Sequence, residues 1–87
     1  MDWVWIRSRM RLAEGHLDLA LNASAAEVVR IHLQRAQEAY AAAMSALEHA
    51  GLNGDEQREL KERMQQVSIR LRMIEHRLRL LLAGREP

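Results

Sequence analysis

Residues that interrupt helices are few in this chain, and their positions leave three long segments in which a helix can form. The only proline is Pro87, and glycine occurs only at positions 15, 51, 54 and 84. Alanine, leucine, glutamate, arginine, glutamine and methionine, which favour helices, are abundant, while threonine and phenylalanine are absent. The chain is therefore predicted to be all-α: a long antiparallel helical hairpin with an additional N-terminal helix, forming a three-helix bundle or a coiled-coil hairpin.

The clearest helix boundary is the segment around Gly51. A glycine suits the left-handed position after a helix end, and Leu52 is then expected to fold back on Leu47. Asn53 or Asp55 is expected to cap the next helix, and Glu56 lies three residues after Asn53 as in a capping box. This segment predicts a tight turn between two helices.

A second boundary lies at Ser24, because Ser24 and Glu27 have the spacing of a capping box. Gly15 is expected to bend or shorten the first helix. The prediction is one domain, residues 1–87, with helices at about 2–21, 24–50 and 54–83.

Apolar residues recur between these boundaries at alternating steps of three and four, which is typical of a helix packed nearly parallel to its neighbour. The predicted core positions are Trp3, Ile6, Met10, Ala13, Leu17 and Ala20 in the first helix, Ala26, Val29, Leu33, Ala36, Tyr40, Ala43, Leu47 and Ala50 in the second, and Leu60, Met64, Val67, Leu71, Ile74, Leu78 and Leu81 in the third.

Two further apolar lines remain once the core positions are assigned. One line follows the first helix at seven-residue spacing, and the other follows the C-terminal half of the third helix, where His76 joins it. Such lines are ordinary where a helix touches two neighbours in a bundle. Apolar patches that carry aromatic and arginine anchors also mark protein interfaces. On that second interpretation the candidate partner-binding residues are Trp5, Arg9, Leu12, Leu19, Ile69, Arg72, Met73, Arg77 and Leu80.

Motifs for catalysis, metal binding or cofactor binding are missing from the sequence. None of the serines lies in a Gly-x-Ser-x-Gly turn, and no glycine-rich phosphate loop is present. There is no cysteine, and folding about residues 52 and 53 places His32 about one turn from His76 without a His-x-x-x-His or Glu-x-x-His motif. We therefore expect a protein that is not an enzyme and that has no metal or cofactor.

The charge pattern disfavours nucleic acid as the main partner. The net charge is only +1, although Arg70, Arg72, Arg77, Arg79 and Arg85 form a basic C-terminal end. These arginines flank the apolar seam, where arginines commonly shield the seam and pair with acidic groups. Glu59 and Arg63 are expected to pair on one helix.

No stretch reaches the length of about 20 apolar residues that a membrane span needs. The four apolar residues 3–6 are also too few for a secretory signal. We expect a cytoplasmic protein.

The leucine-rich segment 17–21, the segment 30–36 and the turn before residues 54–57 together resemble the type III secretion needle-protein co-chaperones. This resemblance covers about residues 17 to 82. It implies a bacterial protein that binds a second, TPR-like chaperone, the pair holding a needle subunit monomeric until export.

The function expected from the sequence is a non-enzymatic helical protein-binding module, most specifically such a secretion co-chaperone. The alternatives are a self-assembling coiled-coil structural or regulatory protein and a small nucleic-acid-binding helical protein.

Overall fold

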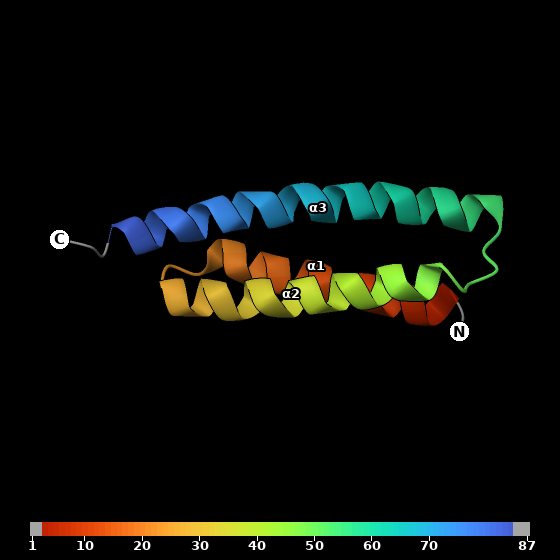
Figure 1. The fold of residues 1–87 in the computed structure, drawn as a ribbon, viewed down its shortest axis with the longest axis horizontal. Coiled ribbons are helices and arrows are strands. Elements are labelled where there is room, and N and C mark those ends of the chain that lie inside the picture. Colours follow the sequence, from red (N-terminus) through yellow and green to blue (C-terminus); the bar gives the residue numbers. More distant parts are fainter. Residues whose placement is uncertain (1–2, 85–87) are drawn as a thin grey trace.

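The computed structural model describes residues 3–84, which form three helices and no strand. They are α1 (Trp3–Asn22), α2 (Ala26–Leu47) and α3 (Gly54–Ala83). Successive helices are antiparallel, and the bundle measures 53 × 19 × 17 Å (Figure 1). The all-α class is confirmed, and the bounds of α3 agree with the predicted range 54–83. The predicted start of the first helix at residue 2 lies outside the described residues, as does Arg85.

The closest helix pair is α1 and α2, and α3 packs across both of them. Many α1 and α2 core positions are alanines, such as Ala13, Ala36 and Ala43, and small side chains allow two helices to approach closely. The 30 residues of α3 span about 45 Å and the 20 residues of α1 about 30 Å. The C-terminal end of α3 therefore extends past the turn between α1 and α2 (Figure 1).

The core agrees with most of the predicted seam positions, and each helix has exceptions. Buried α1 residues are Ile6, Met10, Ala13, Leu17 and Ala20; α3 buries Leu60, Val67, Leu71 and Ile74; α2 buries Ala26, Val29, Leu33, Ala36, Ala39, Ala43 and Ala46. Seven predicted positions are only half-buried: Trp3, Tyr40, Leu47, Ala50, Met64, Leu78 and Leu81. Ala39 and Ala46 are buried in addition to the predicted set. Contact with α1 as well as α3 accounts for this wider buried face of α2.

Charged side chains join α1 to α3 along one edge of the bundle. The ion pairs are Arg7 with Glu59 at 3.5 Å, Arg63 with Glu14 at 2.5 Å, and Arg70 with Asp18. The predicted pairing of Glu59 with Arg63 within α3 is thus wrong, because each residue has a partner on α1. Hydrogen bonding to Glu14 raises the pKa of Arg63. These pairs align α1 and α3 in parallel.

The capping box at the start of α3 is confirmed. The Asn53 side chain accepts a hydrogen bond from the Glu56 backbone N–H at 2.8 Å, and the Asn53 N–H donates to the Glu56 carboxylate at 3.0 Å. The predicted box at Ser24 is wrong, because Ala25 is the N-cap of α2 and no side chain caps it. The connection from α1 to α2 has only three residues, 23–25. Ser24 lies within this connection, one residue before the N-cap.

The left-handed helix end predicted at Gly51 is wrong. No glycine among residues 3–84 has a positive φ, so Gly51 does not form the predicted left-handed helix stop. Instead, α2 ends at Leu47, where the His49 N–H donates to the carbonyl of Ala46 at 3.1 Å in a tightened final turn. The first helix, α1, continues through Gly15 and with 20 residues is shorter than α2 and α3.

Replacing Asn53 with alanine is expected to destabilise the protein by about 1 kcal/mol, because the first turn of α3 loses its side-chain acceptor. Urea denaturation monitored by circular dichroism measures this difference. Ser24→Ala is the matched control and is expected to change stability by less than about 0.5 kcal/mol. Equal losses in the two variants would contradict the assignment of the caps.

Candidate docking surfaces

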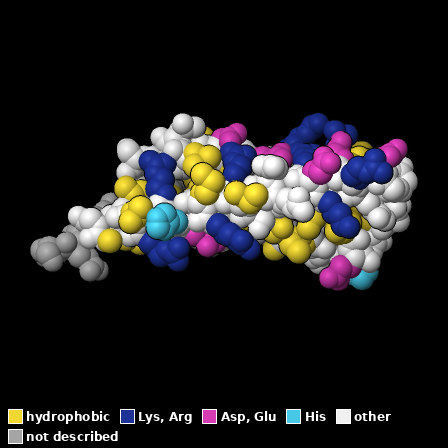
Figure 2. All heavy atoms as spheres, turned by 90° about the horizontal axis from the view of Figure 1, so that it is seen from above, with side chains coloured by type: hydrophobic (Ala, Val, Ile, Leu, Met, Phe, Trp, Pro, Cys, Tyr) yellow, Lys and Arg dark blue, Asp and Glu magenta, His cyan; other side chains and the backbone are white. Residues whose placement is uncertain are grey.

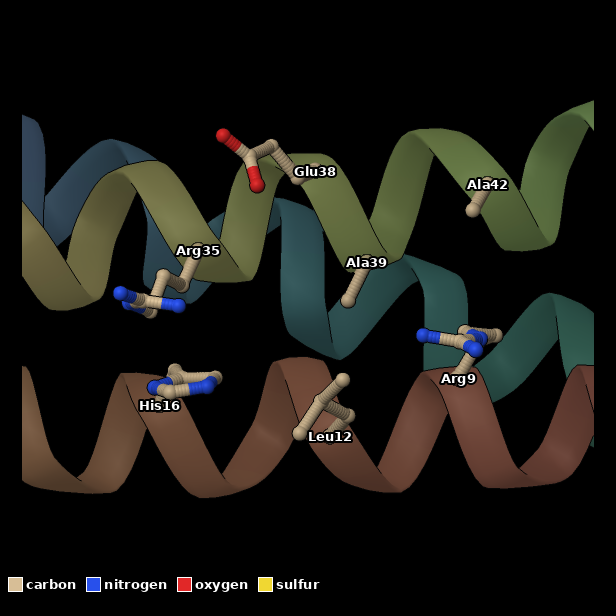
Figure 3. Close-up of a pocket in the computed structure, with 7 residues that line it drawn as sticks. All are labelled: Arg9, Leu12, His16, Arg35, Glu38, Ala39 and Ala42. Carbon is tan, nitrogen blue, oxygen red and sulfur yellow. The ribbon is translucent and has the colours of Figure 1, made fainter.

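A shallow groove runs between α1 and α2 on the side opposite α3. Figure 3 shows its central depression, with α3 behind the two helices. The depression has a volume of about 250 Å³. Residues at heptad spacing from those that line the depression lie on the same faces of α1 and α2, on both sides of it. We define the α1–α2 groove by Trp5, Arg9, Leu12, His16 and Leu19 from α1 and by Val28, His32, Arg35, Glu38, Ala39 and Ala42 from α2.

Apolar side chains in the groove remain open to solvent. Leu12 is 45% exposed, Leu19 is 53% exposed and Val28 is 41% exposed. The predicted second apolar line of α1 is thus not absorbed by contact with a neighbouring helix of this chain. Trp5 differs from the leucines, because its ring is half-buried and packs against the core. The guanidinium carbon of Arg9 lies 5.0 Å from the Trp5 ring centroid, within the range of a cation–π contact.

Two histidines face each other across the groove. The Nδ1 atoms of His16 and His32 lie 2.9 Å apart, so one ring donates an N–H to the other. The sequence placed His32 about one turn from His76, but the hydrogen-bonded partner is His16. Burial lowers the pKa of His16, and the nearby His32 and Arg35 lower it further. The neutral form of His16 is therefore favoured in the folded chain.

Acidification is expected to destabilise the bundle through His16. The unfolded chain binds a proton near pH 6.5, whereas the lowered pKa of His16 delays protonation of the folded chain. Stability is therefore full above about pH 6.5 and falls with pH until the folded pKa is reached, below which this contribution is constant. Thermal unfolding of the wild type and of His16→Gln, measured between about pH 7.5 and about pH 5.5, checks this.

As the pH falls, the Tm of the wild type is expected to decrease more than the Tm of His16→Gln. His49→Gln is the control, because His49 is exposed after the end of α2. A pH-independent difference between wild type and His16→Gln would rule out the linkage.

The second candidate surface lies on the outer side of α3. We define the α3 outer surface by Ile69, Arg72, Met73, His76 and Leu80, all of which are exposed. Ile69 is 53%, Met73 57% and Leu80 60% exposed. Figure 2 looks onto this side of the molecule and shows apolar side chains interspersed with Lys and Arg side chains. The two predicted apolar lines are thus separate surfaces that no described segment covers, on different helices.

Arg77 has an intramolecular role that its prediction as a partner-binding residue did not include. Its guanidinium donates to the backbone carbonyls of Ala20, Leu21 and Ala23, with 2.7 Å to Ala23 and 3.4 Å to Ala20. These carbonyls lie at the end of α1, where helical hydrogen bonding leaves acceptors unsatisfied. We therefore exclude Arg77 from both docking surfaces.

The contribution of α2 to the groove was not predicted from the sequence. Val28, Arg35 and Ala42 are spaced by seven residues, and that spacing was the available signal. This repeat indicates a groove wall only once the packing of α2 against α1 is known. The turn at 23–25 places His32 opposite His16, and the repeat of α2 then lies beside Leu12.

Within residues 3–84 no cluster of three or more His, Cys, Asp or Glu side chains has the geometry to hold a metal ion. None of the described helices is long and apolar enough to cross a membrane.

Comparison of the chain with protein-family models, with curated proteins and with solved structures gives no match in any of the three.

Proposed function

We propose that this protein is a non-enzymatic docking module that binds an amphipathic helix of a partner protein in the α1–α2 groove. One observation carries the proposal: a line of apolar side chains at heptad spacing, including Leu12 and Leu19, stays exposed on the side opposite α3. An amphipathic helix laid in a groove presents apolar residues at the same three- and four-residue spacing. Burial of these leucines would then be completed by the partner.

The groove is favoured over the α3 outer surface because two helices line it. A partner helix in the groove contacts α1 and α2 together, as a fourth helix does in a bundle. The α3 outer surface is the convex side of a single helix and offers a partner less area for contact. The small side chain of the half-buried Ala42 also allows close approach of a partner backbone.

A secretion co-chaperone is the most specific form of this proposal. In that role the partner is a TPR-like chaperone, and the pair covers the apolar helix of a needle subunit in the bacterial cytoplasm. The support for it is the resemblance of residues 17–82 to that family together with the exposed groove. Neighbouring genes for a secretion apparatus are its expected genomic context.

Self-assembly is the second candidate function, and the apolar line on α3 favours it. Ile69, Met73 and Leu80 offer a second copy a contact that does not involve the groove. Nucleic-acid binding is less well supported than it was from the sequence, because Arg70 pairs with Asp18 and Arg77 binds the end of α1. Two arginines of the basic end are therefore occupied within the chain.

A synthetic peptide tests the proposed function directly. The peptide is an amphipathic helix of about 20 residues with leucine on its apolar face and glutamine along both flanks. Fluorescence anisotropy measures its binding to the full chain. Replacing both Leu12 and Leu19 with glutamine is expected to weaken binding at least about tenfold, because apolar area no longer leaves water on docking.

The matched control is Val4→Gln, since Val4 is on α1 and 72% exposed but lies outside the groove. This control is expected to change affinity by less than about twofold. Loss of binding in Val4→Gln that equals the loss in the Leu12 and Leu19 variant would refute docking in the groove.

A further inference from the structure

The α1–α2 groove contains a basic depression at its centre. Arg9, His16 and Arg35 line it, together with the apolar side chains of Leu12, Ala39 and Ala42 (Figure 3). Figure 3 shows Arg35 extending toward His16, with Arg9 near the other end of the depression. Cationic groups therefore occur beside the apolar floor on which a partner helix would lie.

The arginines of this depression differ from those at the α1–α3 edge. Arg7, Arg63 and Arg70 each have a carboxylate partner on the neighbouring helix. Within residues 3–84 neither Arg9 nor Arg35 forms an ion pair with a carboxylate. The Arg9 guanidinium lies over the Trp5 ring.

Glu38 is the one acidic residue that lines the depression, and its position does not neutralise the two arginines. Its side chain is directed away from α1 (Figure 3), and its carboxylate accepts a hydrogen bond from the Gln34 side chain at 3.3 Å. The titratable and charged side chains at the depression are Arg9 and His16 from α1 and His32, Arg35 and Glu38 from α2. No lining residue comes from α3.

We propose that this depression binds a carboxylate and that the partner of the groove is an acidic amphipathic helix, with Asp or Glu flanking its apolar face. The inference rests on the proposed function and specifies the chemistry of its partner. A partner carboxylate beside Arg9 or Arg35 forms the charge-assisted hydrogen bonds that these arginines lack within the described chain. A partner lysine at the same place meets like charge and is rejected.

Charge also argues against two other occupants. The α3 outer surface of a second copy has the apolar spacing to enter the groove, but it brings the exposed Arg72 and Arg79 toward Arg9 and Arg35. A nucleic-acid backbone supplies anions but has no apolar face to cover Leu12 and Ala42. An acidic helix satisfies both the charge and the apolar area of the groove.

Three peptides of one design test the inference. They share the apolar face of the neutral peptide described above and carry glutamate, glutamine or lysine at the flanking positions. Anisotropy titrations of the full chain at about 0.1 M salt are expected to give the glutamate peptide at least about tenfold higher affinity than the lysine peptide. Arg35→Gln is expected to reduce affinity for the glutamate peptide about three- to tenfold and to leave the glutamine peptide within about twofold.

The matched control is Arg58→Gln, which removes the same charge from an exposed position on α3. It is expected to leave all three affinities within about twofold. Equal affinity for the glutamate and lysine peptides would overturn the carboxylate site while leaving the docking proposal intact. Failure of all three peptides to bind would overturn the proposed function itself.

Two further outcomes also contradict the inference. One is tighter binding of a labelled DNA duplex than of the glutamate peptide, with that duplex binding lost in Arg35→Gln. The other is a homodimer in sedimentation equilibrium that dissociates in the Leu12 and Leu19 variant, because a second copy would then occupy the groove.

Discussion

Replacing Ile74 with alanine is expected to lower the free energy of unfolding by about 2–5 kcal/mol. Ile74 is completely buried and belongs to the core cluster that all three helices form. Alanine removes apolar contacts and leaves a cavity that the surrounding helices fill only in part. A loss of this size is a large share of the roughly 5–15 kcal/mol by which a small domain is stable.

The same substitution at Ile69 is the control, because it removes the same atoms from the exposed side of α3. It is expected to change stability by less than about 0.5 kcal/mol. Urea denaturation of both variants measures the difference. A similar loss at the two positions would mean that α3 does not pack through the Ile74 side.

Replacing Arg77 with methionine is expected to cost about 1–3 kcal/mol of stability. Methionine keeps an unbranched apolar stem but removes the donors that satisfy the backbone carbonyls of Ala20, Leu21 and Ala23. The positive charge at the end of α1 is lost as well, and a cation there is favoured by the helix dipole. The variant is therefore expected to loosen the end of α1 and its attachment to α3.

Arg79→Met is the matched control, since Arg79 is an exposed arginine two residues further along α3. Its stability is expected to stay within about 0.5 kcal/mol of the wild type. Thermal denaturation, together with hydrogen exchange of the amides near the end of α1, measures the effect. Faster exchange there in Arg79→Met than in Arg77→Met would contradict the role assigned to Arg77.

Much of the fold could be predicted because local signals and the packing agree. The steps of three and four residues predicted the five buried positions of α1, and Asn53 with Glu56 predicted the start of α3. The start of the second helix near Ser24 and its stop near Gly51 were predicted less well. Capping residues and glycine permit such ends, but the short connection at 23–25 and the tightened last turn of α2 determine where they occur.

The partners of the charged residues could not be predicted from spacing within one helix. Glu59 and Arg63 have the spacing of a pair within α3, yet both meet α1, because the parallel packing of α1 and α3 brings Arg7 and Glu14 closer. Arg77 is of a residue type that is common at interfaces. Whether its side chain contacts the end of α1 depends on the relative position of α1 and α3. The relative position of the packed helices therefore determines which arginines remain available for a partner.

Only the α1 side of the candidate site could be predicted from the sequence. The apolar line of α1 is visible as a repeat of Trp5, Leu12 and Leu19, and the structure leaves both leucines exposed. The opposite wall of the groove, with His32 and Arg35, depends on how α2 turns back along α1. A sequence repeat on one helix does not specify which residues of another helix lie beside it.

The most direct test of the central claim is to map where the neutral amphipathic peptide binds on the isotope-labelled full chain, using amide chemical shifts from nuclear magnetic resonance. We predict the largest shift changes at Leu12, His16 and Arg35 in the α1–α2 groove, and small changes at Ile69 and Met73 on the α3 outer surface. The largest changes at Ile69 and Met73, with the groove unperturbed, would contradict the claim that the groove is the docking site.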